Sequence, residues 1–155
     1  MEMFLKIVPV LGVIALAFAG VLAARVSKQD AGTDRMKEIA SSISEGAQAF
    51  LTAEYKILII FVAVLFFLIG FGIGNWVTAV CFVVGAVFST LAGYFGMSVA
   101  TKANVRTANA AKESGMNKAL SIAFSGGAVM GMCVAGLGVL GVSAIYLITG
   151  NVDVL

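Results

Sequence analysis

Four long stretches of the chain consist almost entirely of apolar residues, and the polar residues gather between them. A helix needs about 20 mostly apolar residues to cross the ~30 Å hydrocarbon layer of a bilayer. The pattern predicts membrane spans at about 7–24, 57–74, 76–100 and 119–148. The fourth is longer than a crossing requires, so we expect it to tilt or protrude. The predicted fold is an all-α integral membrane protein, one domain over residues 1–155, with four transmembrane helices in a packed bundle.

The stretch between the second and third spans is short and rich in glycine. Gly70-Phe-Gly-Ile-Gly74-Asn75 supplies a tight turn, and Trp76 suits the membrane interface. We therefore expect the two spans to form a hairpin with almost no external loop.

The first span has an alternative interpretation as a cleaved signal peptide, because it is rich in small alanines. Signal peptides carry basic residues before the apolar run. Here Lys6 is offset by Glu2, and Arg25 and Lys28 follow the run. This order favours a retained span.

Lysine and arginine predict the orientation of the chain, since they are enriched in cytoplasmic loops. Nine of the ten lie between spans one and two or between spans three and four: Arg25, Lys28, Arg35, Lys37, Lys56, Lys102, Arg106, Lys112 and Lys118. The tenth is Lys6. We expect segments 25–56 and 101–118 in the cytoplasm and both termini outside.

The first polar segment has the periodicity of an amphipathic helix. Apolar residues recur at helical spacing from Met36 to Leu51, and Gly32-Thr33 precedes them with Asp34 in the first turn. No proline follows, so a single helix over 34–71 is predicted, about 57 Å long at 1.5 Å per residue. It either lies on the membrane surface or, as we prefer, packs against other cytoplasmic elements of a larger protein.

The second polar segment is rich in alanine and also favours a helix. Gly115 is a natural stop for it, and Asn117 is placed to cap span four. Arg106 with Lys102 either attracts an anionic ligand or lipid head groups, or anchors the span ends, which we prefer.

Composition then narrows the chemistry. Hydrophobic residues make up 61% of the chain and charged residues 12%, and there is no histidine. The net charge of +2 gives no indication of a nucleic-acid partner. Cys81 and Cys133 lie in apolar runs without metal-ligand spacing, which favours small core- or lipid-facing residues. No acidic or basic residue lies in the middle of a span, where ion pumps place functional charges.

Two further patterns bear on metal binding and on helix packing. Asp30 and Asp34 have the spacing of two Mg²⁺ ligands on one helix face, but Gly32 between them indicates a loop, so we interpret them as structural. Small residues recur at helix-packing spacing, which favours a tight bundle; they are Gly70 with Gly74, Gly127 with Gly131, and Ala15, Ala19 and Ala23.

Several long strings resemble the start of the membrane-bound, ion-translocating inorganic pyrophosphatases. They are Gly32-Thr-Asp-Arg-Met-Lys-Glu-Ile-Ala40, Ala49-Phe-Leu-Thr-Ala-Glu-Tyr-Lys56, Ala100-Thr-Lys-Ala-Asn-Val-Arg-Thr-Ala-Asn-Ala-Ala111 and Ala123-Phe-Ser-Gly-Gly-Ala-Val-Met-Gly131. The resemblance runs in the same order along nearly the whole chain.

The resemblance implies a homodimer of subunits with about sixteen helices in two rings. Such proteins hydrolyse Mg²⁺-bound pyrophosphate at the cytoplasmic side, move H⁺ or Na⁺ outward, and in some cases need K⁺. The family's acidic motifs and its membrane-embedded carboxylate and lysine have no matching positions here. We therefore assign no catalytic, cofactor-binding or metal residue to this chain, and we expect it to be inactive alone.

The first hypothesis for function is thus a scaffold part of such a pump, partnered by the remaining helices and the lipid bilayer. The alternative is a free-standing four-helix membrane protein with a structural or assembly role, which the lack of charges within the spans also suits.

Overall fold

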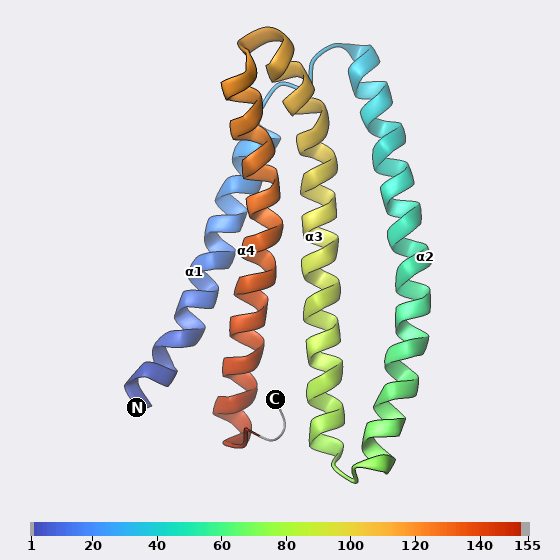
Figure 1. Ribbon diagram of the computed structural model, residues 1–155, viewed down its shortest axis with the longest axis vertical. Helices are drawn as coiled ribbons and strands as arrows, with labels where there is room; N and C mark the ends of the chain where they lie inside the picture. Colours follow the sequence, from blue (N-terminus) through green and yellow to red (C-terminus); the bar gives the residue numbers. More distant parts are fainter. Residues whose placement is uncertain (1, 153–155) are drawn as a thin grey trace.

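The computed structural model describes residues 2–152, with side chains from Ile7 onward. In this range the chain forms four helices (Figure 1): α1 (Glu2–Ser27), α2 (Asp34–Gly72), α3 (Trp76–Ser114) and α4 (Met116–Thr149). Each is long and apolar enough to cross a membrane. The prediction of an all-α membrane fold with four spanning helices is confirmed.

The helices extend well past the apolar runs that predicted them. α2 and α3 have 39 residues each, about 58 Å at 1.5 Å per residue, which is nearly twice the hydrocarbon thickness. The continuous helix predicted over 34–71 begins at Asp34 as expected and ends one residue later, at Gly72. Thr33 is its N-cap, because the Thr33 hydroxyl accepts a hydrogen bond from the amide of Met36.

The helices stand in the order α1, α4, α3, α2, so neighbours in space are not always neighbours in sequence (Figure 1). α2 packs on α3 and contacts neither α1 nor α4, while α1 packs mainly on α4. Residues 28–33 and Gly115 lie at one end of the bundle, and the α2–α3 turn lies at the other (Figure 1). The first of these, termed the charged end below, carries Lys28, Lys112 and Lys118.

Small side chains form the interior where α1, α3 and α4 meet. Ala19 and Leu22 of α1 cluster with Ala92 of α3 and with Val129 and Cys133 of α4. Large apolar side chains point outward instead. Ile148 is 84% exposed and Phe71 and Phe124 are each 75% exposed, which suits a lipid surround and would be a liability in water.

The α2–α3 turn is as tight as the sequence predicts. Gly74 has a φ of +71°, and the Asn75 side chain caps α3 by accepting from the amides of Val77 and Thr78. Trp76 lies against Gly70, where an added Cβ would be 2.6 Å from the indole. The expectation that Gly70 and Gly74 form a helix-packing pair is wrong, because Gly74 lies beyond the end of α2.

The α3–α4 turn consists of a single residue. Gly115 ends α3 with a φ of +87°, as predicted, but α4 begins at once with Met116. Asn117 therefore lies inside the helix, and α4 starts without a side-chain cap. The predicted Asn117 cap is wrong, because the glycine reverses the chain without any intervening residue.

The hydrogen bond between Tyr55 and Thr90 fixes the register of α2 on α3. The Tyr55 hydroxyl donates to the Thr90 carbonyl oxygen at 3.0 Å. The start of span two is thus level with Thr90, although the apolar run of span three continues to about residue 100. The part of α3 nearer the charged end therefore extends beyond the level at which α2 becomes fully apolar.

Candidate functional site

The main polar site of the described chain lies at the charged end, where Arg106 of α3 binds the end of α1. Its Nε donates to the Gln29 carbonyl oxygen at 3.0 Å, and Nη2 donates to the Ser27 carbonyl oxygen at 3.2 Å. The last carbonyls of a helix have no partner within it and carry partial negative charge. The guanidinium supplies both the missing donors and the opposite charge. Nη1 donates to the carbonyl oxygen of Lys102, one turn earlier in α3, at 2.8 Å.

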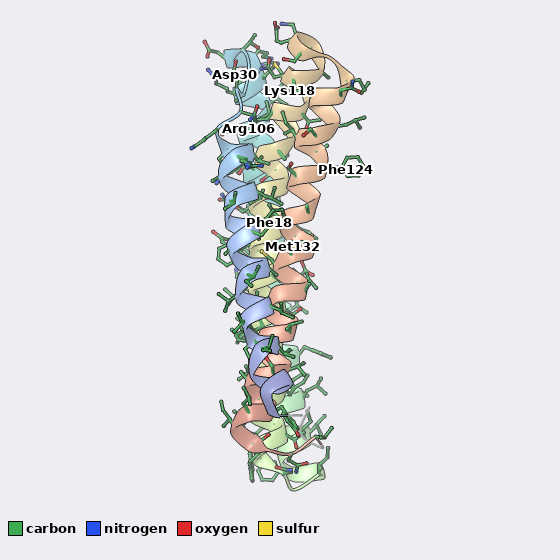
Figure 2. The ribbon with its side chains drawn as sticks, turned by 90° about the vertical axis from the view of Figure 1, so that its left-hand side faces the viewer. Phe18, Asp30, Arg106, Lys118, Phe124 and Met132 are labelled. Atoms are coloured by element: carbon green, nitrogen blue, oxygen red, sulfur yellow. The ribbon has the colours of Figure 1, made fainter. Side chains whose placement is uncertain are left out.

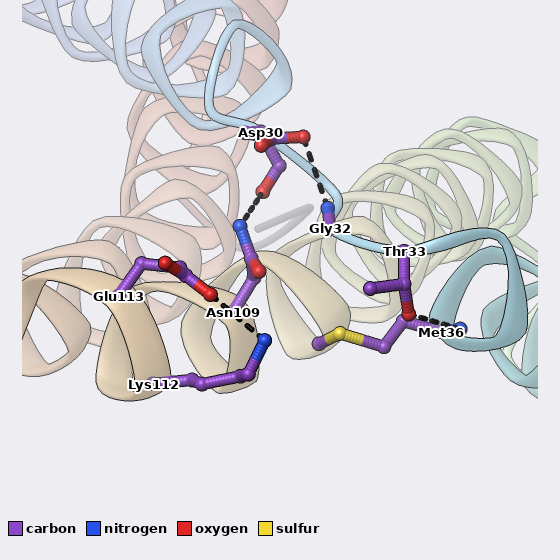
Figure 3. A network of polar contacts seen from close by, with 7 residues as sticks. All are labelled: Asp30, Gly32, Thr33, Met36, Asn109, Lys112 and Glu113. Atoms are coloured by element: carbon purple, nitrogen blue, oxygen red, sulfur yellow. Dashed lines mark hydrogen bonds and ion pairs between the residues drawn. The ribbon is translucent and has the colours of Figure 1, made fainter.

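Asn109 lies one turn further along α3 and holds the next part of the linker (Figure 3). Its side chain is only 6% exposed, and Nδ2 donates to the Asp30 carbonyl oxygen at 3.4 Å. Gly32 passes directly over it, since an added Cβ would lie 2.6 Å from Asn109 Oδ1. Gly32 also has a φ of +81°, a left-handed conformation that glycine adopts without strain. Close approach and backbone conformation both require glycine here.

The linker is also organised by its own side chains. The carboxylate of Asp30 accepts a hydrogen bond from the Gly32 amide at 3.0 Å, which closes a turn over residues 30–32 (Figure 3). Arg106 and Asn109, with the linker residues Gln29, Asp30 and Gly32 that they hold, are called the linker clamp below.

A hollow of about 470 Å³ opens beside the linker clamp. Besides clamp residues it is lined by Glu113, Ser114 and Lys118, and Figure 2 shows Asp30, Arg106 and Lys118 near this end of the bundle. Lys112 is bound to Glu113 at 2.8 Å, and this hydrogen bond, together with the carboxylate charge, raises the pKa of the lysine. Charges of both signs line the hollow, so it does not favour an anion.

The contacts of Arg106 bear on its two interpretations. Each of its three nitrogens donates one hydrogen bond to a backbone carbonyl, which uses three of the five N–H donors of the guanidinium. These contacts favour the anchoring role at the end of α1.

The carboxylates of the described residues do not fit a Mg²⁺ site. Asp30 is committed to the linker turn, and Asp34 pairs with Lys37 at 3.1 Å. Glu38 pairs with Arg35 at 2.7 Å. Among the side chains that the structure describes, no group of three or more possible ligands converges. Asp30 and Asp34 thus each make a local contact within residues 30–37.

Comparison with known proteins identifies the family. The model of the inorganic H⁺ pyrophosphatase family matches residues 13–154. The chain belongs to this family. Residues Gly32, Arg106 and Asn109 all lie within the matched range, so the linker clamp is built from the part that carries the family resemblance.

Three relatives of this chain are named as ion pumps and are much longer than it. A K⁺-insensitive pyrophosphate-energized proton pump of Methanosarcina mazei is 44% identical over 154 residues, which cover 99% of this chain and 23% of the relative. A K⁺-stimulated pyrophosphate-energized sodium pump of Thermotoga maritima is 44% identical over 139 residues, covering 89% and 19%. A protein of Clostridium tetani, provisionally named a sodium pump of the same kind, is 56% identical over 132 residues, covering 85% and 19%. The chain spans about a fifth of the length of these relatives.

The sequence draws attention to several residues of the linker clamp but does not predict that they contact one another. Asp30, Gly32, Arg106 and Asn109 are all conspicuous polar or turn residues in the sequence. Their contact is not predictable from spacing, because it joins segments 77 or more residues apart. Gln29 and Ser27 contribute only backbone carbonyls, so no side-chain pattern signals them.

Proposed function

We propose that this chain is the scaffold portion of a membrane pyrophosphatase, which couples hydrolysis of Mg²⁺-bound pyrophosphate to outward transport of H⁺ or Na⁺. The observation that carries this proposal is the family match over residues 13–154. The relatives' names add pyrophosphate as the energy source and cover both ions. Mg²⁺ belongs to the proposed parent enzyme, and some relatives are K⁺-stimulated while others are K⁺-insensitive.

The chemistry of the described residues supports a scaffold role in preference to a catalytic one. A pyrophosphate site needs several carboxylates around Mg²⁺, and Asp30, Asp34 and Glu38 each make a local hydrogen bond or ion pair instead. The apolar middles of the helices contain no charged group that would carry an ion. Catalysis and transport are therefore assigned to helices outside these 155 residues.

The proposed orientation places segments 25–56 and 101–118 in the cytoplasm and both termini outside. Nine of ten basic residues support it. Gly115→Cys tests this sidedness, since an impermeant maleimide is expected to label it from the cytoplasmic side only. Labelling only from outside would reverse the topology.

The proposed partners are the remaining helices of the parent protein, a second subunit and the lipid bilayer. The outward-facing apolar side chains of α2 support the need for a surround of lipid or further helices. The alternative of a free-standing four-helix protein is not favoured, because the three relatives named above are pumps of far greater length.

Pyrophosphate hydrolysis tests the proposal directly. Inverted membrane vesicles that contain the full-length protein are expected to release phosphate from Mg²⁺-pyrophosphate and to accumulate H⁺ or Na⁺. The 155-residue chain alone, freed of soluble pyrophosphatase, is expected to release none. Vesicles with correctly inserted full-length protein but no pyrophosphate-dependent turnover would refute the pump, and turnover by the short chain would refute the scaffold role.

A further inference from the structure

Four aromatic side chains meet at the α2–α3 turn. Phe66, Phe67 and Phe71 belong to the last turns of α2, and Trp76 is the first residue of α3. Phe66 lies against Phe67 and Trp76, with ring centroids 5.4 and 5.8 Å apart. Phe71 lies against the same two rings, at 6.4 and 5.1 Å. The four rings, called the aromatic cluster below, thus form a closed circuit of contacts that joins the two helices.

The aromatic cluster faces the surroundings of the bundle and not its interior. Phe71 is 75% exposed, Phe67 55% and Trp76 46%. Neighbouring exposed rings form an apolar patch, which is unfavourable in water. These three rings therefore need apolar contact from outside the described chain.

The turn beside the aromatic cluster needs the opposite surroundings. The Ile73 amide donates to the Ile69 carbonyl oxygen, whereas the carbonyls of residues 70–72 follow it without partners of their own helix. Residues 73–75 lie between the two helices. Non-helical backbone exposed to lipid is not stable within hydrocarbon, because no water satisfies its polar groups. The turn must therefore lie in a layer that contains water, directly beside rings that must avoid it.

No charged side chain holds this end of the hairpin at a fixed depth, since residues 57–101 contain no Asp, Glu, Lys or Arg. The charged residue of α2 nearest to the aromatic cluster is Lys56. It lies fifteen residues before Phe71, about 22 Å along the helix. Lysine extends its ammonium group toward the aqueous side. Lys56 and the aromatic cluster thus bracket a distance close to the ~30 Å thickness of the hydrocarbon layer.

We propose that the aromatic cluster anchors the α2–α3 hairpin in the head-group layer of a phospholipid bilayer, on the side opposite the charged end (Figure 1). This layer offers water to the turn and apolar contact to the rings within a few ångströms. Tryptophan is enriched there, because the indole combines an apolar body with an N–H donor. Since the rings of both helices are in mutual contact, the aromatic cluster sets one depth for α2 and α3 together.

Cysteine labelling in the full-length protein tests the anchor. Gly72→Cys is the reporter, because an added Cβ at this position meets nothing within 4 Å. It is placed in a background from which Cys81, Cys133 and all other cysteines are removed. A membrane-impermeant maleimide is applied from the side opposite to the one that labels Gly115→Cys. Each rate is divided by that of the same protein unfolded in detergent.

Two triple variants with matched exposure are compared. The test variant carries leucine, which is apolar but has no ring, at three positions of the aromatic cluster: Phe67→Leu, Phe71→Leu and Trp76→Leu. The control variant carries leucine at three phenylalanines outside the aromatic cluster that are 47%, 56% and 75% exposed: Phe18→Leu, Phe61→Leu and Phe124→Leu.

Labelling of Gly72→Cys is expected with all four rings in place, and it is expected to slow about threefold or more in the test variant, because the reactive thiolate forms in water and leucine lets the turn move toward hydrocarbon. The control variant is expected to keep the original rate. If the triple test variant does not reach the membrane, Phe71→Leu alone is compared with Phe124→Leu, since both rings are 75% exposed.

Three results would overturn the proposal. An unlabelled Gly72→Cys before any ring is replaced would place the turn within hydrocarbon or under other parts of the protein. An unchanged rate in the test variant would mean that the rings do not set the depth. Equal slowing in the control variant would mean that the aromatic cluster has no special part in it. Labelling is independent of pyrophosphate turnover, so the anchor and the pump can fail separately.

Discussion

Gly12 of α1 and Gly136 of α4 face each other where the two helices cross. A Cβ added to Gly12 would lie 2.9 Å from the Gly136 carbonyl oxygen, and one added to Gly136 would lie 3.0 Å from the Gly12 carbonyl oxygen. The two backbones are thus in reciprocal contact. α1 is held to the bundle at this crossing and, at its other end, by the linker clamp.

Replacing Gly136 with alanine is expected to push α1 and α4 apart. The added methyl group meets backbone as well as the Leu16 side chain, and backbone yields little, so we expect a loss of about 1–3 kcal/mol in the free energy of unfolding. Gly20→Ala is the control, because its methyl group would enter open space. Thermal unfolding of the detergent-solubilised chain measures both. An unchanged melting temperature for Gly136→Ala would show that the crossing is looser than described.

Gly32→Ala is expected to disrupt the linker clamp. The substitution combines a left-handed φ of +81° with a methyl group placed on the Asn109 amide, and such strain costs about 1–3 kcal/mol. Gly46→Ala, in an open position within α2, is expected instead to stabilise the helix by about 0.5–1 kcal/mol. Thermal unfolding is expected to show a lower melting temperature for Gly32→Ala and a higher one for Gly46→Ala. A tolerated Gly32→Ala would mean that the linker can lift off α3.

Arg106→Lys is expected to weaken the linker clamp almost as much as Arg106→Ala. Lysine keeps the charge but lacks the fork that reaches the Ser27 and Gln29 carbonyls together. Each hydrogen bond from a charged donor contributes about 1.5–3 kcal/mol, reduced here by partial exposure. Hydrogen exchange at the end of α1 should speed up in both variants. Full rescue by lysine would indicate that charge alone, and not geometry, caps α1.

Gly70→Ala is expected to displace the Trp76 ring. The new methyl group would lie 2.6 Å from the indole in its present position. Trp76 is the only tryptophan of the 155 residues, so the intrinsic fluorescence of this chain reports on the α2–α3 turn alone. We expect a shifted emission maximum for Gly70→Ala and an unchanged one for Gly72→Ala, which adds its methyl group to open space. Identical spectra would contradict the described packing.

The sequence predicted the positions and the ends of the helices, because these depend on the order of residues along a single helix. Apolar runs located the four spans, and the periodicity after Thr33 placed the start of α2 at the correct residue. Gly115 was identified as a helix stop because few other residues adopt its φ. These are local properties, set by backbone conformation and side-chain type.

The sequence did not predict which faces meet, since glycine and alanine occur on nearly every face of the spans. Gly127 and Gly131 have helix-packing spacing but contact nothing in this chain, whereas Gly12 and Gly136 carry the α1–α4 crossing without any pattern to distinguish them. The linker clamp was missed for the same reason. Its contacts depend on the register of α3 against a linker far away in the chain, and register is a tertiary property.

The placement of α1 beside α4 also sets an order of events during synthesis. α1 does not contact α2, the next helix in the chain. Its main partner, α4, therefore emerges from the ribosome only after about ninety further residues. At about 5–20 residues per second, α1 waits roughly 4–18 s for α4. During that interval the translocation machinery or the lipid must cover the face of α1 that carries Gly12. The hairpin of α2 and α3, joined by the three residues 73–75, can pair as soon as it is inserted, before α1 meets α4.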